Sequence, residues 1–407
     1  TMAVTRQITD HITWVGGSDR RLALFENLFP LRDGVTYNSF LISDEKTALV
    51  DTVDGAIARE FLDNVQAALK GRPLDYLIIN HMEPDHCDQI DTLRLIHPNV
   101  TLVGNSKTFQ MIRQFYGMDL EGRSLEMKDG DVLPLGTHSL RFLLAPMVHW
   151  PEVMFTFEEH SGMLFSADAF GSFGGFHGSI FSDEDDYHEL HLAETRRYYT
   201  NIVGKYGLQV QRAMKKAASL PVTMIAPLHG PVLRGDDMAL ILSKYALWSQ
   251  YAPEETGVLI AYGSMYGNTE QAAHLLAASL VERGLRPVRL FDVSKAHVSD
   301  IVADAFRLSH WVFAAPTYNM GLYAPMEALL RDLAALNLKN RDVAIIANGS
   351  WSPVADQVME ELLGRMKDIR FLAPPITIQS ALTDPQRGDI KALADRIADS
   401  CRQGEGS

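Results

Sequence analysis

The chain has 407 residues and is acidic, with a formal net charge of −14 at pH 7. This charge argues against nucleic acid or an anionic membrane surface as a partner. The two cysteines, Cys87 and Cys401, are too few for a disulfide framework or for a four-cysteine iron–sulfur or rubredoxin-type site. No apolar run reaches the ~18 residues that cross a bilayer, and the N-terminus has no signal-peptide core, so we expect a cytoplasmic protein.

The first part of the chain, residues 1–251, is rich in short apolar runs that predict strands, with helical stretches between them. A helix is predicted near residues 56–70, and further helices over 187–218. The mixture predicts stacked α/β layers rather than a doubly wound sheet. The predicted strands are 36–43, 46–53, 74–79, 99–104, 138–145, 153–157, 162–166 and, as the last one, 222–227.

The pattern changes around residues 250–256, where Y-A-P-E-E-T-G predicts a linker. Strands and helices alternate regularly after it, beginning with G-V-L-I-A-Y (257–262) and a helix from about 268 to 283. Further strands are predicted in P-V-R-L-F-D-V, H-W-V-F-A-A-P and D-V-A-I-I-A-N. Apolar strands with intervening helices predict a parallel, doubly wound sheet for a second domain over 257–401.

A short stretch of the first domain, N-H-M-E-P-D-H-C, concentrates ionisable groups behind the apolar run L-D-Y-L-I-I. It contains His81, Glu83, Asp85 and His86 within six residues. Pro84 disfavours a helix interior, so we expect a loop at a strand end. Four such groups would repel or desolvate one another unless a cation held them, which favours a metal site.

Three more ligand-type residues follow predicted strands of the same domain: His149, Asp168 and His229. Each alone is more often a structural histidine or a helix cap. Seven such residues in this arrangement favour a metal centre instead. From the residues of the first domain alone, a zinc hydrolase that activates water remains open. The other histidines considered are expected to be structural or on the surface: His11, His97, His138, His160, His177, His188 and His191.

The second domain opens with V-L-I-A-Y-G-S-M-Y-G-N-T-E, a strand, a hydroxyl- and glycine-rich loop, and a helix. Backbone N–H groups at a helix N-terminus hold phosphate. Two more polar loops, 315–321 and 348–353, follow later strands, and open α/β sheets bind ligands at that edge. The absence of Gly-x-Gly-x-x-Gly gives no support to a nicotinamide site. The predicted ligand-binding residues are Ser264, Met265, Tyr266, Gly267, Asn268, Thr269, Pro316, Thr317, Tyr318, Asn319, Gly321, Asn348, Gly349, Ser350 and Trp351.

The pattern His-x-Glu-x-Asp-His, followed by a distant His, Asp and His, resembles the dinuclear motif of the metallo-β-lactamase superfamily. The usual hydrolytic motif has a histidine where this chain has Glu83. A carboxylate hardens the site and favours ferric iron over zinc. The second half resembles flavodoxin in its phosphate loop, residues 264–269, and FMN is the expected ligand. The combination of a metallo-β-lactamase-like αββα sandwich with a flavodoxin-like domain resembles the flavodiiron proteins (A-type flavoproteins) over nearly the whole chain.

The resemblance implies a role for each metal-site residue. One iron would take His81, Glu83 and His149, the other would take Asp85, His86 and His229, and Asp168 would bridge the two. These seven residues would also carry the catalysis. We expect the aromatic, glycine-rich segment F-G-S-F-G-G-F-H-G, residues 170–178, to flank the metals.

The resemblance also implies the reaction, the reduction of dioxygen to water or of nitric oxide to nitrous oxide. FMN would pass on electrons from an external donor, such as rubredoxin or a reduced deazaflavin. A head-to-tail homodimer, or a dimer of such dimers, would bring the flavin of one subunit to the iron pair of another. Two alternatives are a zinc hydrolase with an appended flavodoxin and an electron carrier whose first domain is only structural. The sequence does not choose between dioxygen and nitric oxide.

Overall fold

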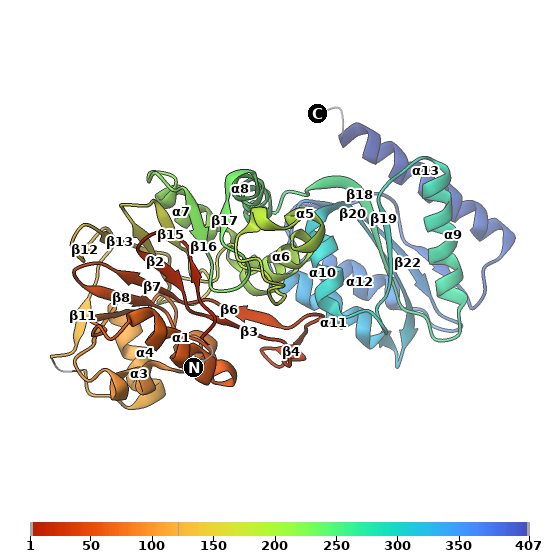
Figure 1. Cartoon of the computed structure of the whole chain (residues 1–407). Helices are drawn as coiled ribbons and strands as arrows, with labels where there is room; N and C mark the ends of the chain where they lie inside the picture. Colours follow the sequence, from red (N-terminus) through yellow and green to blue (C-terminus); the bar gives the residue numbers. More distant parts are fainter. Residues whose placement is uncertain (1–2, 121, 405–407) are drawn as a thin grey trace. The chain divides into compact units, whose positions relative to one another are not determined.

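The computed structural model describes residues 3–120 and 122–404. It divides into two compact units, Thr1–Tyr245 and Ala246–Ser407, each with its own sheets and core. Figure 1 follows the chain through the two units in sequence order. None of the helices in the described residues combines the length and the apolar composition needed to cross a membrane.

The N-terminal unit is a sandwich of two mixed sheets. The first sheet has the strand order β1-β2-β7-β8-β9-β10-β11 and the second β12-β13-β14-β15-β16-β17. Side chains such as Phe40 of one sheet and Phe142 and Phe165 of the other fill one shared core. Its strands are β1 (Arg6–Gln7), β2 (Ile12–Trp14), β3 (Gly17–Asp19), β4 (Leu24–Phe25), β5 (Phe29–Pro30), β6 (Val35–Tyr37), β7 (Phe40–Ser43), β8 (Thr47–Val50), β9 (Tyr76–Ile78), β10 (Thr101–Gly104), β11 (Ser124–Glu126), β12 (Val132–Pro134), β13 (Ser139–Leu144), β14 (Met154–Glu158), β15 (Met163–Phe165), β16 (Met224–Ala226) and β17 (Leu233–Arg234).

Helices cover the outer faces of this sandwich, which completes the αββα arrangement (Figure 1). Helix α1 packs against β7 and helix α7 against β13. The helices are η1 (Gly55–Ile57), α1 (Ala58–Leu69), α2 (Pro84–Cys87), α3 (Ile90–Ile96), α4 (Ser106–Tyr116), η2 (Ser182–Glu184), α5 (Tyr187–Leu190), α6 (Leu192–Tyr198), the π-helical turn η3 (Tyr199–Val203), η4 (Gly204–Tyr206), α7 (Gly207–Ala217) and α8 (Gly235–Ser249).

Two strand predictions in this unit were wrong. The single strand predicted over 36–43 is two strands, β6 and β7, in different sheets. The chain turns between them at Asn38, whose backbone N–H donates to the carbonyl of Leu228 instead of continuing a ladder. Its side-chain amide donates to the carbonyls of Pro227 and Gly230 and holds the turn in place. The run 222–227 is not the last strand either, since the short strand β17 follows it and pairs antiparallel with β16.

The C-terminal unit is a doubly wound sheet with the order β19-β18-β20-β22-β23, and β24 extends the last position. The main strands are parallel, and their order is that of flavodoxin-like folds. The last strand comes in two pieces because Pro374 and Pro375, which lack amide hydrogens, lie between them. The strands are β18 (Glu255–Tyr262), β19 (Val288–Asp292), β20 (Leu308–Tyr318), β21 (Gly321–Leu322), β22 (Arg341–Asn348), β23 (Ile369–Phe371) and β24 (Ile376–Ile378).

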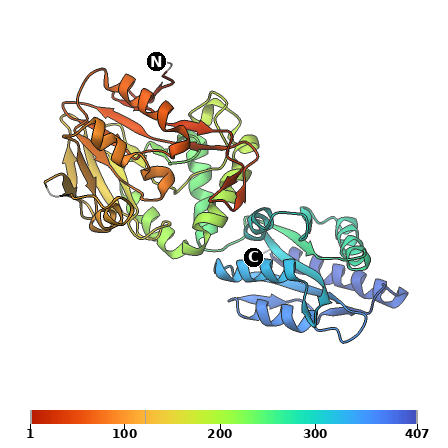
Figure 2. The ribbon, with the colours of Figure 1, turned by 90° about the horizontal axis from the view of Figure 1, so that it is seen from below.

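Helices lie on both faces of this sheet (Figure 2). Helices α9 and α13 pack together on one face, and α10, α11 and α12 cover the other. The sheet therefore has two buried faces, which explains its continuous apolar strands. The helices are α9 (Asn268–Glu282), α10 (Val298–Arg307), α11 (Ala324–Ala335), α12 (Ala355–Gly364) and α13 (Asp384–Gly404).

The segment before β18 is fastened to the C-terminal unit by one buried side chain. The guanidinium of Arg341, which is 2% exposed, donates hydrogen bonds to the carbonyls of Tyr251, Ala305 and Phe306. Carbonyl dipoles thereby compensate a buried cation.

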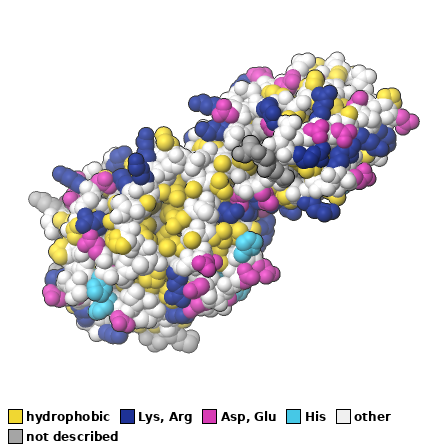
Figure 3. All heavy atoms as spheres, turned by 90° about the horizontal axis from the view of Figure 1, so that it is seen from above, with side chains coloured by type: hydrophobic (Ala, Val, Ile, Leu, Met, Phe, Trp, Pro, Cys, Tyr) yellow, Lys and Arg dark blue, Asp and Glu magenta, His cyan; other side chains and the backbone are white. Residues whose placement is uncertain are grey.

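On the outside, Figure 3 shows Lys and Arg interspersed with Asp and Glu, so the net charge of −14 does not form a single-sign field on that face.

Candidate functional site

The sequence predicts a loop for the His81–His86 stretch, but the second half of the stretch is helical. Pro84 begins the short helix α2 instead of breaking one. Proline fits the first helical position because the amide hydrogen that it lacks has no partner there, and its fixed φ suits the helix. His81 and Glu83 thus precede the helix, whereas Asp85 and His86 project from its first turn.

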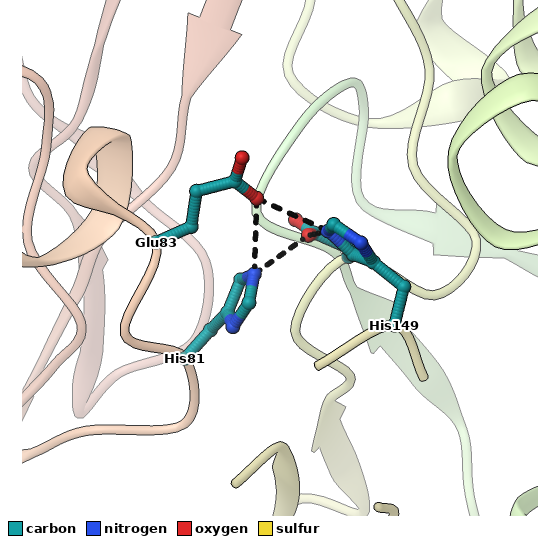
Figure 4. A group of neighbouring side chains, drawn as sticks. His81, Glu83 and His149 are labelled. Atoms are coloured by element: carbon teal, nitrogen blue, oxygen red, sulfur yellow. Dashed lines mark hydrogen bonds and ion pairs between the residues drawn. The ribbon is translucent and has the colours of Figure 1, made fainter. Parts of the chain in front are cut away.

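The first group of side chains contains His81, Glu83, His149 and Asp168, with ligand atoms all within 4.8 Å of one another. Figure 4 shows the two imidazoles and the Glu83 carboxylate pointing toward a common centre. The Nε2 atoms of His81 and His149 lie 3.2 Å and 3.1 Å from Glu83 Oε2. The same two nitrogens lie 3.1 Å and 3.0 Å from Asp168 Oδ2.

The second group contains Asp85, His86 and His229. Asp85 Oδ2 lies 3.3 Å from the Nε2 atom of each of the two histidines. The other oxygen of Asp168, Oδ1, lies 3.3 Å from His86 Nε2 and 3.6 Å from His229 Nε2. The two oxygens of Asp168 therefore face different groups, the geometry that a bridging carboxylate requires.

The nitrogen and oxygen atoms of this cluster are arranged to bind a pair of cations rather than to form hydrogen bonds with one another. The carboxylate oxygens of Asp85 and Asp168 are buried, and no described residue gives them a hydrogen bond of good geometry. The Nε2 atoms of His86 and His229 face each other at 3.0 Å. Buried lone pairs directed at one another are costly unless a cation lies between them. Four imidazoles and three carboxylates form a nitrogen and oxygen donor set that suits iron.

The pKa values of these groups reflect the same concentration of charge. Burial lowers the pKa of His149, but the adjacent Asp168 and Glu83 carboxylates outweigh it and raise the value to about 9. Burial likewise opposes the charge of His81, yet the Asp168 carboxylate holds its pKa well above the usual range. The carboxylates thus attract protons to the imidazoles, and bound metal ions would replace those protons.

Aromatic rings surround the second group. Phe25, Tyr37 and Tyr198 are buried and lie with ring centroids 5.2, 5.7 and 5.4 Å from that of His229. The segment 170–178 follows closely, since the Ser172 amide donates a hydrogen bond to the His229 carbonyl. The hypothesis that this segment flanks the cluster agrees with the structure. The rings of Phe25, Tyr37 and Tyr198 thus help to bury His229, which is 0% exposed.

Two carboxylates near the cluster were missed by sequence reasoning. Glu152 is fully buried, and its Oε1 atom lies 2.7 Å from His81 Nδ1. Its position three residues after His149, in H-W-P-E, was the one signal in the sequence. Glu26 lies in the turn between β4 and β5, where desolvation and then Glu83 raise its pKa to about 8. No motif surrounds Glu26, because only the hairpin brings it to the cluster.

The C-terminal unit has a cleft at the carboxyl ends of its strands. The loop after β18 leads into the N-terminus of α9, and the loops after β20 and β22 lie beside it. The cleft brings together most of the residues predicted there. It is lined by Ser264, Met265, Tyr266, Asn268, Thr269, Pro316, Thr317, Asn319, Met320, Asn348, Gly349, Ser350, Trp351 and Ser380.

The cleft differs from the prediction at five positions. Gly267, Tyr318 and Gly321 do not line it, whereas Met320 and Ser380 do. Gly267 has φ +93°, so it shapes the turn into α9 without presenting a side chain. Ser380 follows β24, a short strand that sequence patterning had not indicated. None of the described residues in the lining carries a charged side chain, so phosphate there would rely on hydroxyl and backbone N–H groups at the start of α9.

Comparison with known families divides the chain in the same way. Residues 35–230 match the ODP family beta lactamase, and residues 260–370 match flavodoxin. Among solved structures, the chain is similar to the rubredoxin oxygen:oxidoreductase of the anaerobe Desulfovibrio gigas, with a TM-score of 0.92 and 27% identity over 99% of this chain and 100% of that one. It is similar to the flavodiiron protein of Giardia intestinalis as well, with a TM-score of 0.91 and 25% identity over 99% of each chain.

Relatives with curated descriptions extend over nearly the same length. The nitric oxide reductase of Moorella thermoacetica is 31% identical over 402 residues, which cover 96% of this chain and 98% of the relative. The anaerobic nitric oxide reductase flavorubredoxin of Klebsiella pneumoniae is 30% identical over a region that covers 97% of this chain and 80% of the relative. With both domains, the paired donor groups and these relatives in agreement, the chain belongs to the flavodiiron proteins, oxidoreductases whose cofactors are a pair of iron ions and FMN.

Proposed function

We propose that this flavodiiron protein reduces dioxygen to water, nitric oxide to nitrous oxide, or both, with electrons that pass through FMN to the iron pair. The observation that carries the proposal is the orientation of the Asp168 carboxylate, whose two oxygens face two separate histidine groups. A hydrolytic site with a histidine in place of Glu83 would hold one carboxylate less. The relatives' descriptions as nitric oxide reductase and as rubredoxin oxygen:oxidoreductase support the substrate class.

In this proposal the seven residues hold two irons. His81, Glu83 and His149 would hold one, Asp85, His86 and His229 would hold the other, and Asp168 would be shared between them. The iron pair, when bound, would supply electrons for reduction of a small diatomic molecule. The protein limits access to the cluster by burial, since His81 and His229 are 0% exposed.

The surroundings of the cluster favour a small, uncharged substrate. Phe25, Tyr37 and Tyr198 form an aromatic wall beside His229, and Trp150 stacks edge-on against His81 at 5.3 Å between ring centroids. Apart from the hydroxyls of Tyr37 and Tyr198, this wall gives no polar partner to a hydrolysable substrate. Dioxygen and nitric oxide need none.

The flavin site belongs to the same proposal. The loop 264–269 would hold the FMN phosphate at the N-terminus of α9, and the loops 316–321 and 348–351 would hold the ring system. The cleft is rimmed by exposed apolar side chains, such as Tyr266, Met320 and Trp351, which are 93%, 66% and 78% exposed. Apolar side chains at such exposure are typical of a surface that meets a partner.

That rim supports the remaining parts of the proposal. We place there the head-to-tail contact of a homodimer, or of a dimer of dimers, and the approach of an external donor of the rubredoxin or reduced-deazaflavin type. We further propose that the functional halves are residues 1–251 and 257–401 and that the compartment is the cytoplasm.

The decisive measurement is metal and flavin content of protein purified from iron-supplemented cells, followed by stopped-flow oxidation of the reduced protein. We expect about two irons and one FMN per chain, and rapid flavin oxidation by dioxygen, nitric oxide or both. Zinc in place of iron would refute the proposal in favour of a hydrolase. Two irons without oxidation by either gas would refute the substrate assignment alone.

A further inference from the structure

A buried carboxylate outside the seven residues stands directly behind one of the two groups. Glu152 is 0% exposed, and its Oε1 atom accepts the Met82 amide at 2.7 Å and lies 2.7 Å from His81 Nδ1. The amide of Asn105 donates to the Glu152 carbonyl at 2.6 Å, which fixes the backbone there. Contacts to the carboxylate and to the backbone carbonyl of the same residue therefore fix the position of Glu152.

The hydrogen-bond direction at His81 follows from these contacts. Its Nε2 atom faces Glu83 and Asp168 and is the atom available to a metal. Its Nδ1 atom therefore carries the hydrogen and donates it to Glu152. A carboxylate behind a metal-binding imidazole fixes the orientation of the ring and increases its donation to the metal.

Among the described residues, the second group has no carboxylate hydrogen-bonded behind its histidines, although the buried Asp51 carboxylate lies close enough to His86 for their charges to interact. His229 Nδ1 lies 2.7 Å from the backbone carbonyl of Thr36, a neutral acceptor. His86 Nδ1 has no hydrogen-bond partner among the described residues. The second oxygen of Glu152, Oε2, is buried and also lacks a partner within the described part of the chain. The negative charge of Glu152 thus acts mainly on His81, on one side of the cluster.

We propose that Glu152 is a positioning residue that makes the two metal positions unequal. It tightens binding at the position formed by His81, Glu83 and His149, and it makes the metal there the more electron-rich of the two. The inference rests on the proposed iron pair, and it concerns the division of labour between the two ions. It predicts two chemically distinct irons, because the Nδ1 atoms of their histidine ligands have different hydrogen-bond acceptors.

The test compares Glu152→Gln with Glu152→Ala, using anaerobically reduced protein loaded with ⁵⁷Fe and FMN. The matched control is Glu158→Gln, because Glu158 is also 0% exposed and accepts a hydrogen bond from an imidazole, His138 Nδ1 at 2.8 Å, outside both groups. Mössbauer spectra report the two irons separately. Iron retained against a chelator reports affinity, and flavin content reports the integrity of the other domain.

We expect Glu152→Gln to keep both irons but to change one of the two quadrupole doublets, since the amide oxygen still accepts from His81 but carries no charge. The dissociation constant of one iron should rise about 10- to 100-fold, and further in Glu152→Ala. Glu158→Gln should leave both doublets and both affinities unchanged.

Two results would overturn the inference: unchanged doublets in Glu152→Gln, or equal changes in both. If Glu152→Ala fails to fold, the glutamine variant still decides the question. Failure of the proposed function is a separate outcome, since it would show in the wild-type protein as zinc, or as the absence of reaction with both gases.

Discussion

The two halves of this chain form their sites in different ways. In the N-terminal unit, seven side chains from separate segments converge, and each contributes a particular donor atom. In the C-terminal unit, short loops at one sheet edge form a cleft from backbone, hydroxyl and amide groups, with no charged side chain in its lining. The first site depends on residue type and the second on loop geometry. Substitutions should therefore affect them to very different degrees.

The largest effect is expected for Asp168→Ala. Removing the carboxylate that faces both groups should leave less than about one-tenth of the iron bound at each position, because neither group retains its shared ligand. FMN content should stay near one per chain, since the flavin cleft lies in the other unit. Metal analysis and flavin absorbance of the purified variant measure both. Loss of iron and FMN together would contradict the independence of the two sites.

A smaller effect is expected for Asn348→Ala in the flavin cleft. The side chain of Asn348 joins two loops, because it donates to the Ser380 carbonyl at 2.9 Å and accepts the Ser380 amide at 3.1 Å. Two lost hydrogen bonds of about 1 kcal/mol each would weaken FMN binding by at most roughly 30-fold, because these bonds are also present in the protein without FMN. Fluorescence titration of the apoprotein with FMN measures it. Ser350→Ala, which removes one bond to Ser380, is the control and should weaken binding less.

The third prediction concerns the opposite edge of the same sheet. Burial raises the pKa of Asp342, but hydrogen bonds from Arg370, His310 and Ser400 outweigh it and hold the pKa below its usual value. Its stabilising contribution is therefore present above pH ~3.9, the unfolded value, and is lost as pH falls through the lower folded value. Because Arg370 is largely exposed, we expect Asp342→Asn to cost only about 1 kcal/mol at pH 7.

Urea unfolding at pH 7 and at pH 3 measures that contribution. The difference in unfolding free energy between wild type and Asp342→Asn should shrink at the lower pH. Asp368→Asn is the control, since Asp368 and Asp342 line one cleft together with His310 and Arg370. Asp368 has φ 54°, which asparagine also tolerates. A difference that grows as pH falls would contradict the assignment.

The smallest effect is expected for Trp351→Ala. Its ring is 78% exposed at the cleft, so its contribution to FMN binding is limited to stacking, about 1 kcal/mol or roughly five-fold in affinity. Trp351→Phe should retain most of it. Iron content should not change. An effect larger than that of Asn348→Ala would mean that side-chain type matters more in this cleft than its loop architecture indicates.

The contrast between the two sites also determines what the sequence could predict. Residue types alone indicated a metal at His81–His86, because folding by itself seldom requires four ionisable donors within six residues. The position of His149, Asp168 and His229 after predicted strands already favoured one metal centre, but the division of the seven residues between two metal positions came only from the family resemblance. Glu152 and Glu26 were missed because a second carboxylate behind a ligand leaves no periodic pattern in the sequence.

In the flavin unit the limits were different. Loops after strongly apolar strands, such as 264–269, were predictable from Ser, Thr and Gly. Ser380 was not, because Pro374 and Pro375 divide the preceding strand into pieces too short to recognise. Pro84 misled the prediction in a different way. A proline ring disfavours the interior of a helix but suits its first position, where Pro84 lies.

Pro84 has a consequence for changing this protein. It marks the point where the motif passes from one metal position to the other, with Glu83 just before helix α2 and Asp85 just inside it. Substitutions on either side of this residue can therefore alter one position while leaving the other's ligands in place. A single exchange, Glu83→His, would restore the usual hydrolytic motif and would change the donor atoms of only the position formed with His81 and His149. The chain would thus be a framework for a heterometallic pair, in which Asp168 would be the ligand common to both ions.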